Sequence, residues 1–131
     1  MNFEKLLNNF DMGVCVDQLQ RESLVDLVLL FIEMDGVVED SEMAYAFDWV
    51  SSLKWDNELS PVDYVKQNLI NARAAIEAGD EKDFIRHRSQ NLIDSPAKTL
   101  AVELATGVSI ADGHLDAKEA SAISFLKECV A

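Results

Sequence analysis

Residues 17–36 read DQLQRESLVDLVLLFIEMDG, and this stretch indicates how the whole chain folds. Asp17 suits the N-cap of a helix, with Gln20 three residues later, and Gly36 suits the position just past its end. The apolar residues between them recur at helical spacing: Leu24, Leu27, Val28, Phe31 and Ile32. We therefore predict a helix that begins near residue 17 and ends near residue 36.

Similar start and stop signals recur along the rest of the chain. Ser60-Pro61 and Ser95-Pro96 each place a capping residue before a proline, and Gly79 follows the first of the two apolar-periodic stretches. Strand-like alternation over a useful length is hard to find. Further helices are predicted over residues 3–10, 40–53, 61–79, 80–92, 95–112 and 116–130. The predicted fold is all-α, a compact single-domain bundle of about six to seven helices covering residues 1–131.

The chain is strongly acidic. Its 131 residues include 11 Lys and Arg against 24 Asp and Glu, for a formal net charge of -13, and residues 22–53 hold eight acidic residues with no Lys or Arg. Such a field repels phosphate backbones and anionic lipid surfaces, so we expect no nucleic-acid partner and no direct membrane insertion. No signal-peptide layout or membrane-length apolar run is found, and the predicted location is the cytoplasm.

Two segments of the chain repeat one short pattern. Residues 35–42 and residues 112–119 both read Asp-Gly-x-apolar-acid-x-x-Glu. Each segment lies between the end of one predicted helix and the start of the next, and its Gly can adopt the positive φ that follows a helix end. The sequence therefore predicts two pseudo-repeated helix-turn-helix hairpins, at about residues 20–54 and 96–130.

The acidic residues of this repeat allow two interpretations. In the first, they belong to solvated capping turns that bind nothing. In the second, they hold a cation. Asp35 and Asp112 lie at predicted helix C-termini, where the macrodipole disfavours an anion by about 0.3–1 kcal/mol, and a bound cation reverses that penalty. The occurrence of the same spacing twice, in very acidic stretches, keeps both interpretations open.

The repeat also matches the second half of an EF-hand loop, in which an Asp precedes the turn Gly and a Glu closes the cage. The first half is missing, because apolar Phe31 and Val108 stand where leading acidic ligands are needed. One half-loop offers too few oxygens for calcium, which takes about six to eight, whereas two half-loops on one ion supply enough. The predicted ligands are Asp35, Glu42, Asp112 and Glu119, with Glu39 and Asp116 in reserve. Calcium is the expected ion, followed by magnesium.

With this doubled pattern, the chain from about Gln20 to Val130 resembles the TerB-like family, named for tellurite resistance protein B. The resemblance implies an all-helical bundle with two pseudo-symmetric hairpins and an acidic patch that binds divalent cations. It further implies a role in bacterial stress responses alongside protein partners that are membrane-associated or calcium-binding, and no catalytic activity. The chain departs from strict symmetry at Glu33, because Ile110 stands at the equivalent place in the second copy.

Other candidate residues are few. Arg86-His87-Arg88 is interpreted as an exposed helix face whose positive charge offsets that of neighbouring acidic residues. The alternative is that these residues bind a phosphate or a carboxylate. His114 is interpreted as an exposed turn residue, with metal ligation as the alternative. Cys15 and Cys129 are predicted to be buried thiols.

These observations predict a protein that is not an enzyme and that binds or senses divalent cations. The alternative is a metal-free interaction module whose acidic face docks a basic protein partner. A third possibility, an enzyme that uses two of the carboxylates with a metal, lacks any accompanying nucleophile or base pattern.

Overall fold

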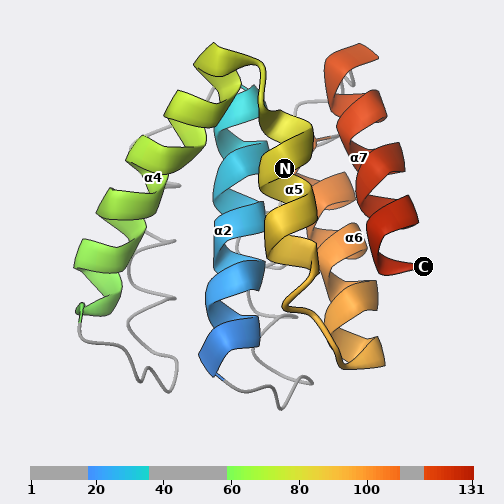
Figure 1. Ribbon diagram of the computed structural model, residues 1–131, viewed down its shortest axis with the longest axis horizontal. Coiled ribbons are helices and arrows are strands. Elements are labelled where there is room, and N and C mark those ends of the chain that lie inside the picture. Colours follow the sequence, from blue (N-terminus) through green and yellow to red (C-terminus); the bar gives the residue numbers. More distant parts are fainter. Residues whose placement is uncertain (1–17, 36–58, 110–116) are drawn as a thin grey trace.

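The computed structural model describes residues 18–35, 59–109 and 117–131, and within these ranges every regular element is a helix (Figure 1). The helices are α2 (Gln18–Asp35), α4 (Pro61–Ala78), α5 (Glu81–Ser89), α6 (Ser95–Ser109) and α7 (Ala117–Val130). The predicted all-α class is confirmed for the described residues. The helices predicted over residues 3–10 and 40–53 lie outside these residues, so the expected number of helices and the pseudo-repeat stay predictions.

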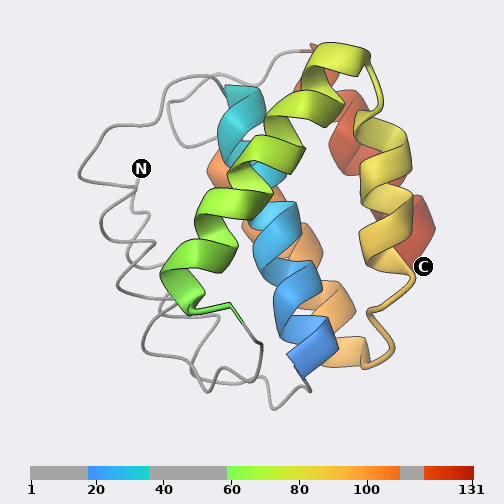
Figure 2. The same ribbon diagram turned by 60° about the vertical axis from the view of Figure 1, so that its left-hand side comes forward.

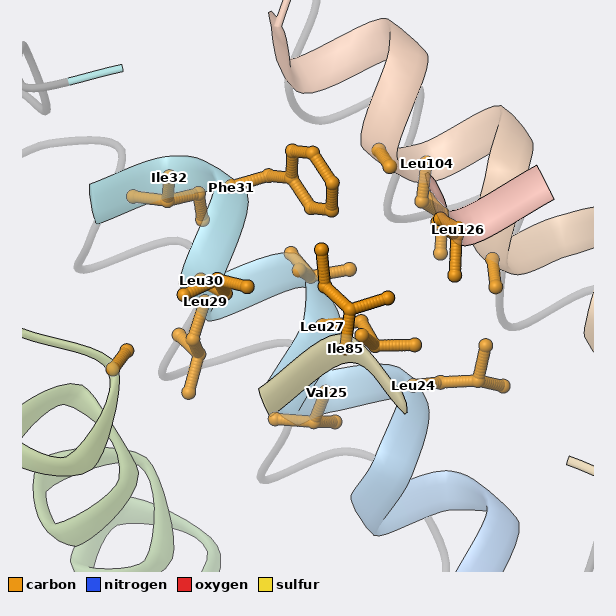
Figure 3. Close-up of a cluster of buried hydrophobic side chains, with 14 of the residues drawn as sticks. Leu24, Val25, Leu27, Leu29, Leu30, Phe31, Ile32, Ile85, Leu104 and Leu126 are labelled. Atoms are coloured by element: carbon orange, nitrogen blue, oxygen red, sulfur yellow. The ribbon is translucent and has the colours of Figure 1, made fainter. Parts of the chain in front are cut away.

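Helix α2 lies at the centre of the bundle and packs against α4, α5, α6 and α7. Its apolar surface is wider than the predicted stripe, because Val25, Leu29 and Leu30 are also buried. Figure 3 shows side chains of α2 meeting Ile85 of α5, Leu104 of α6 and Leu126 of α7. A stretch of helix that is apolar on all sides belongs inside a protein, and the uninterrupted apolar run from Leu27 to Ile32 accounts for the central position of α2.

The chain direction brings several helix ends together. Helices α2, α4 and α6 run one way, and α5 and α7 run the opposite way (Figures 1 and 2). As a result, α2 ends and α5 and α7 begin at the same end of the bundle, toward which α6 also runs. No helix among the described residues has both the length and the apolar character needed to cross a membrane.

The predicted boundaries of α4 are confirmed in detail. The Ser60 hydroxyl accepts a hydrogen bond from the Asp63 backbone N–H at 3.2 Å, and Pro61 takes the first helical position. At the other end, Gly79 has a φ of 75°, and its N–H donates to the Ile76 carbonyl at 3.1 Å. The Asp80 N–H donates to the Ala75 carbonyl at 2.7 Å, which completes a Schellman motif.

Replacing Gly79 by Ala is expected to lower the free energy of unfolding by about 1 kcal/mol. A Cβ at this position would meet no atom within 4 Å, so the loss comes from the left-handed backbone alone. Gly79→Asn is expected to cost less, because Asn tolerates this conformation better than Ala. Urea denaturation of the three proteins measures the difference, and an Ala variant as stable as the parent would contradict it.

One other predicted boundary needs correction. Helix α5 ends at Ser89 and not near residue 92, because the Asn91 and Leu92 N–H groups bond to the Arg88 and Ser89 carbonyls in a tight turn. Helix α6 begins at Ser95 as predicted, with the Asp94 carbonyl accepting from the Lys98 N–H at 3.1 Å.

Candidate functional site

The described residues include two of the six predicted cation ligands. Asp35 is the last residue of α2, and Glu119 lies in the first turn of α7 with 3% of its surface exposed. The other four lie outside the described residues, as does His114: Glu39, Glu42, Asp112 and Asp116. Within the described part of the chain, no group of three or more His, Cys, Asp or Glu side chains is placed to hold a metal ion.

The helix ends that flank the two acidic segments are adjacent. The last turn of α2 and the first turns of α5 and α7 border a cavity of about 140 Å³. We call this region the acidic-turn end of the bundle. Its described lining residues are Met34, Glu81, Lys82, Lys118, Ser121 and Ala122. Because Met34 precedes Asp35 and Lys118 precedes Glu119, both of these acidic residues belong to the acidic-turn end.

One carboxylate at the acidic-turn end already has a cationic partner. The Lys118 ammonium lies 2.8 Å from Oε1 of Glu81, whose side chain is 12% exposed. Burial alone would raise the pKa of Glu81, but hydrogen bonds from Lys118 and from the backbone, together with the Lys118 charge, lower it overall. Glu81 of α5 is therefore held as an anion by Lys118 of α7, and the lysine reduces the negative potential at the acidic-turn end.

Glu33 also has a partner. Its carboxylate accepts a hydrogen bond from Nε of Arg73 on α4 at 3.0 Å. This ion pair links the last turns of α2 and the middle of α4. Glu33 has no acidic counterpart in the second segment. Its ion pair with Arg73 joins two helices, and this structural role accounts for Glu33 without a role in cation binding.

A second polar cluster, which the sequence analysis did not find, lies inside the bundle. Asp26 of α2 is 4% exposed. One of its carboxylate oxygens accepts from the Tyr64 hydroxyl of α4 at 2.8 Å, and the other accepts from Nε of Arg88 of α5 at 2.8 Å. We call these three residues the buried triad. It joins three helices through one carboxylate.

The electrostatics of the buried triad are dominated by burial. Desolvation raises the pKa of Asp26 to about 6, against the lowering effects of Arg88 and the Tyr64 hydrogen bond. Desolvation and the Asp26 charge also raise the pKa of Tyr64, which keeps its proton. The sequence signal for this site was an acid in the middle of an apolar run, but nothing local identified its partners.

Gln20 of α2 forms a further buried link. Its side-chain oxygen accepts from the backbone N–H groups of Ile93 and Asp94 at 3.2 and 3.1 Å, and its amide donates to the Asp94 carboxylate at 2.9 Å. Gln20 is 1% exposed. These bonds fix the connection between α5 and α6 against α2, so this cluster has a structural role.

The basic run on α5 divides between two environments. Arg86 bonds to Asp83 at 2.9 Å on the exposed face and lies 5.4 Å from the Phe125 ring centroid, as the exposed-face interpretation requires. Arg88 differs: it lies over the Phe84 ring at 4.3 Å and enters the buried triad. The interpretation of all three residues as one exposed face is therefore wrong for Arg88. Cys129 is a half-buried free thiol, and Cys15 lies outside the described residues.

The chain was compared with known protein families, with curated proteins and with solved structures, and no match was found in any of the three.

Proposed function

We propose that this protein is a non-enzymatic, TerB-like binder of divalent cations, and that its two acidic segments share one ion. The supporting observation is the meeting of the α2 and α7 ends around one cavity. The proposed ligands are Asp35, Glu42, Asp112 and Glu119, with Glu39 and Asp116 as secondary candidates. A role in the bacterial stress response, in the cytoplasm and with a protein partner, belongs to the same proposal.

The chemistry of the donor set favours calcium. Carboxylates are hard oxygen ligands, and calcium accepts about six to eight of them in flexible geometry. Magnesium is second, because it requires a near-ideal octahedron and gives up its water reluctantly. Glu119 is already ordered in the first turn of α7, so the cation would add to a partly formed arrangement.

Calcium is expected to stabilise the protein against unfolding. An ion that binds only the folded state adds about 2.7 kcal/mol at a hundredfold excess over its Kd. Thermal unfolding with calcium, after treatment with a chelator, measures this shift. Sodium chloride at the same ionic strength is the control, because it only screens the net charge of -13. Equal shifts from the two salts would mean that calcium only screens charge and that no cation site exists.

A single shared ion predicts a distinctive result for two carboxylate variants. Glu42→Gln and Glu119→Gln should each weaken calcium binding at least about tenfold, and the double variant should be little worse, because the ligands act as a unit. Glu128→Gln, on the exposed far end of α7, is the matched control and should bind like the parent. Isothermal titration calorimetry distinguishes the models. Two independent sites, each lost with its own Glu, would exclude a shared ion.

A further inference from the structure

A groove between α6 and α7 lies away from the acidic-turn end. It is formed by the first turns of α6 and the last turns of α7, and its volume is about 330 Å³. This is within the range of about 300–1,000 Å³ that is usual for small-molecule sites. Its polar lining includes Ser95, Lys98, Thr99 and Lys127, and its apolar lining includes Val102 and Val130. We call it the α6–α7 groove.

The two lysines of the α6–α7 groove form no ion pair with any described residue. This distinguishes them from Lys118, Arg73, Arg86 and Arg88, each of which has a carboxylate partner. Lys98 is half-buried and Lys127 is exposed. The chain as a whole has a formal net charge of -13. Two lysines in one groove, neither with a described carboxylate partner, make the local potential less negative than that of the rest of the surface.

The sign of the local charge is set by these lysines. The positive N-terminus of α6 and the negative C-terminus of α7 both lie at the groove, so their dipoles oppose each other. Glu103 is the single acid among the described lining residues and pairs with neither lysine. Two ammonium groups against one carboxylate give the described lining residues a net positive charge.

The polar groups of α6 lie on one side of that helix. Ser95, Lys98 and Thr99 follow the i, i+3, i+4 spacing that places side chains on a common helix face. Two hydroxyl donors therefore flank an ammonium group. Val102, one turn further along α6, and Val130 of α7 add apolar surface beside these donors.

We propose that the α6–α7 groove binds a small monocarboxylate with a short hydrocarbon chain. The carboxylate would lie against Lys98 and the hydroxyls of Ser95 and Thr99, and the hydrocarbon chain would cover Val102 and Val130. A monoanion fits better than a phosphate monoester, because the negative field of the whole protein opposes a dianion about twice as strongly. This proposal is independent of cation binding at the acidic-turn end.

Hexanoate is a suitable probe, with amide chemical shifts of the full-length ¹⁵N-labelled protein as the readout. We expect saturable shifts at Lys98, Thr99, Val102 and Lys127. Hexanol lacks the charge, acetate lacks the chain and hexylamine has the opposite charge, and each should bind at least about fivefold more weakly. Hexanol binding as tight as hexanoate, or saturable shifts confined to other parts of the chain, would overturn the proposal.

Matched lysine variants test the charge of the groove directly. Lys98→Gln and Lys127→Gln should each weaken hexanoate binding by about two- to fivefold, the range of a partly solvated ion pair. Lys66→Gln removes an exposed lysine of α4 that also lacks an ion pair among the described residues, and it should bind hexanoate like the parent. If Lys66→Gln weakens binding as much as Lys98→Gln does, hexanoate responds only to overall charge and no specific site exists.

Discussion

Arg88→Met is expected to lower the free energy of unfolding by about 3 kcal/mol at pH 7. Removing one member of a buried ion pair usually costs about 3–5 kcal/mol, because the other charge is left without a partner. Asp26 is 4% exposed, and Tyr64 alone would remain to donate to its carboxylate among the contacts given above. The loss is expected at the lower end of the range, since Asp26 can take up a proton instead of staying charged.

Protonation gives this variant a characteristic pH dependence. Without Arg88, the pKa of Asp26 should rise further, so the destabilisation should be greatest above pH 7 and should shrink toward pH 5. Urea denaturation at several pH values measures it. Arg86→Met is the matched control, because Arg86 bonds to the exposed Asp83 three residues earlier on α5, and its loss should cost less than about 1 kcal/mol. Equal losses from the two variants would show that the ion pair of the buried triad contributes no more to stability than an exposed ion pair does.

The helix boundaries that the sequence predicted well are those set by local chemistry. Ser60, Pro61 and Gly79 act on backbone groups within a few residues, so their pattern can be read directly from the chain. Helix α2 was also predicted, but not the burial of every residue from Ser23 to Ile32. A period of 3.6 identifies one apolar face, whereas the residues on the other sides of α2 are buried because four helices surround it.

The buried triad shows where sequence patterns stop being informative. Asp26 is separated from Tyr64 by 38 residues and from Arg88 by 62. No spacing rule for helices or turns relates such distant positions, so the partners emerge only when α4 and α5 pack against α2. The pattern placed Arg88 on an exposed face for the same reason: its neighbours along α5 are exposed, but its tertiary contact is not.

At the candidate cation site, too, the sequence predicted local features but not tertiary contacts. The repeated sequence pattern identified the acidic segments, and the structure adds that α2, which ends at Asp35, and α7, which carries Glu119, meet at one cavity. The Lys118–Glu81 pair in that region could not be anticipated, because its two members belong to different helices. Lys118 lies within the second acidic segment and brings a positive charge to the region where the proposed cation would bind.

Asp26→Asn should have the opposite effect to Arg88→Met and should stabilise the protein at pH 7. Burial raises the pKa of Asp26 from 3.8 to about 6, which means that the folded protein favours the neutral side chain. A shift of this size corresponds to about 3 kcal/mol, which is the upper limit of the expected gain. Asn is neutral at every pH, and its amide can accept from Arg88 and donate to the Tyr64 oxygen. The Tyr64 hydroxyl can then donate to the Glu22 carbonyl, which lies 3.5 Å away.

The difference between the parent and Asp26→Asn should depend on pH in one direction only. Between about pH 4 and pH 6, the folded parent binds more protons at Asp26 than the unfolded chain does, because its folded pKa is the higher one. The contribution of Asp26 is therefore complete below pH 4 and is lost as the pH rises through 6. The advantage of the Asn variant should accordingly be small near pH 4 and largest at pH 7, while other titrating groups contribute to both proteins alike.

Chemical denaturation of both proteins from pH 4 to pH 8 measures this difference. An Asn variant that becomes less stable relative to the parent as the pH rises would mean that the bundle favours the charged carboxylate over its neutral form.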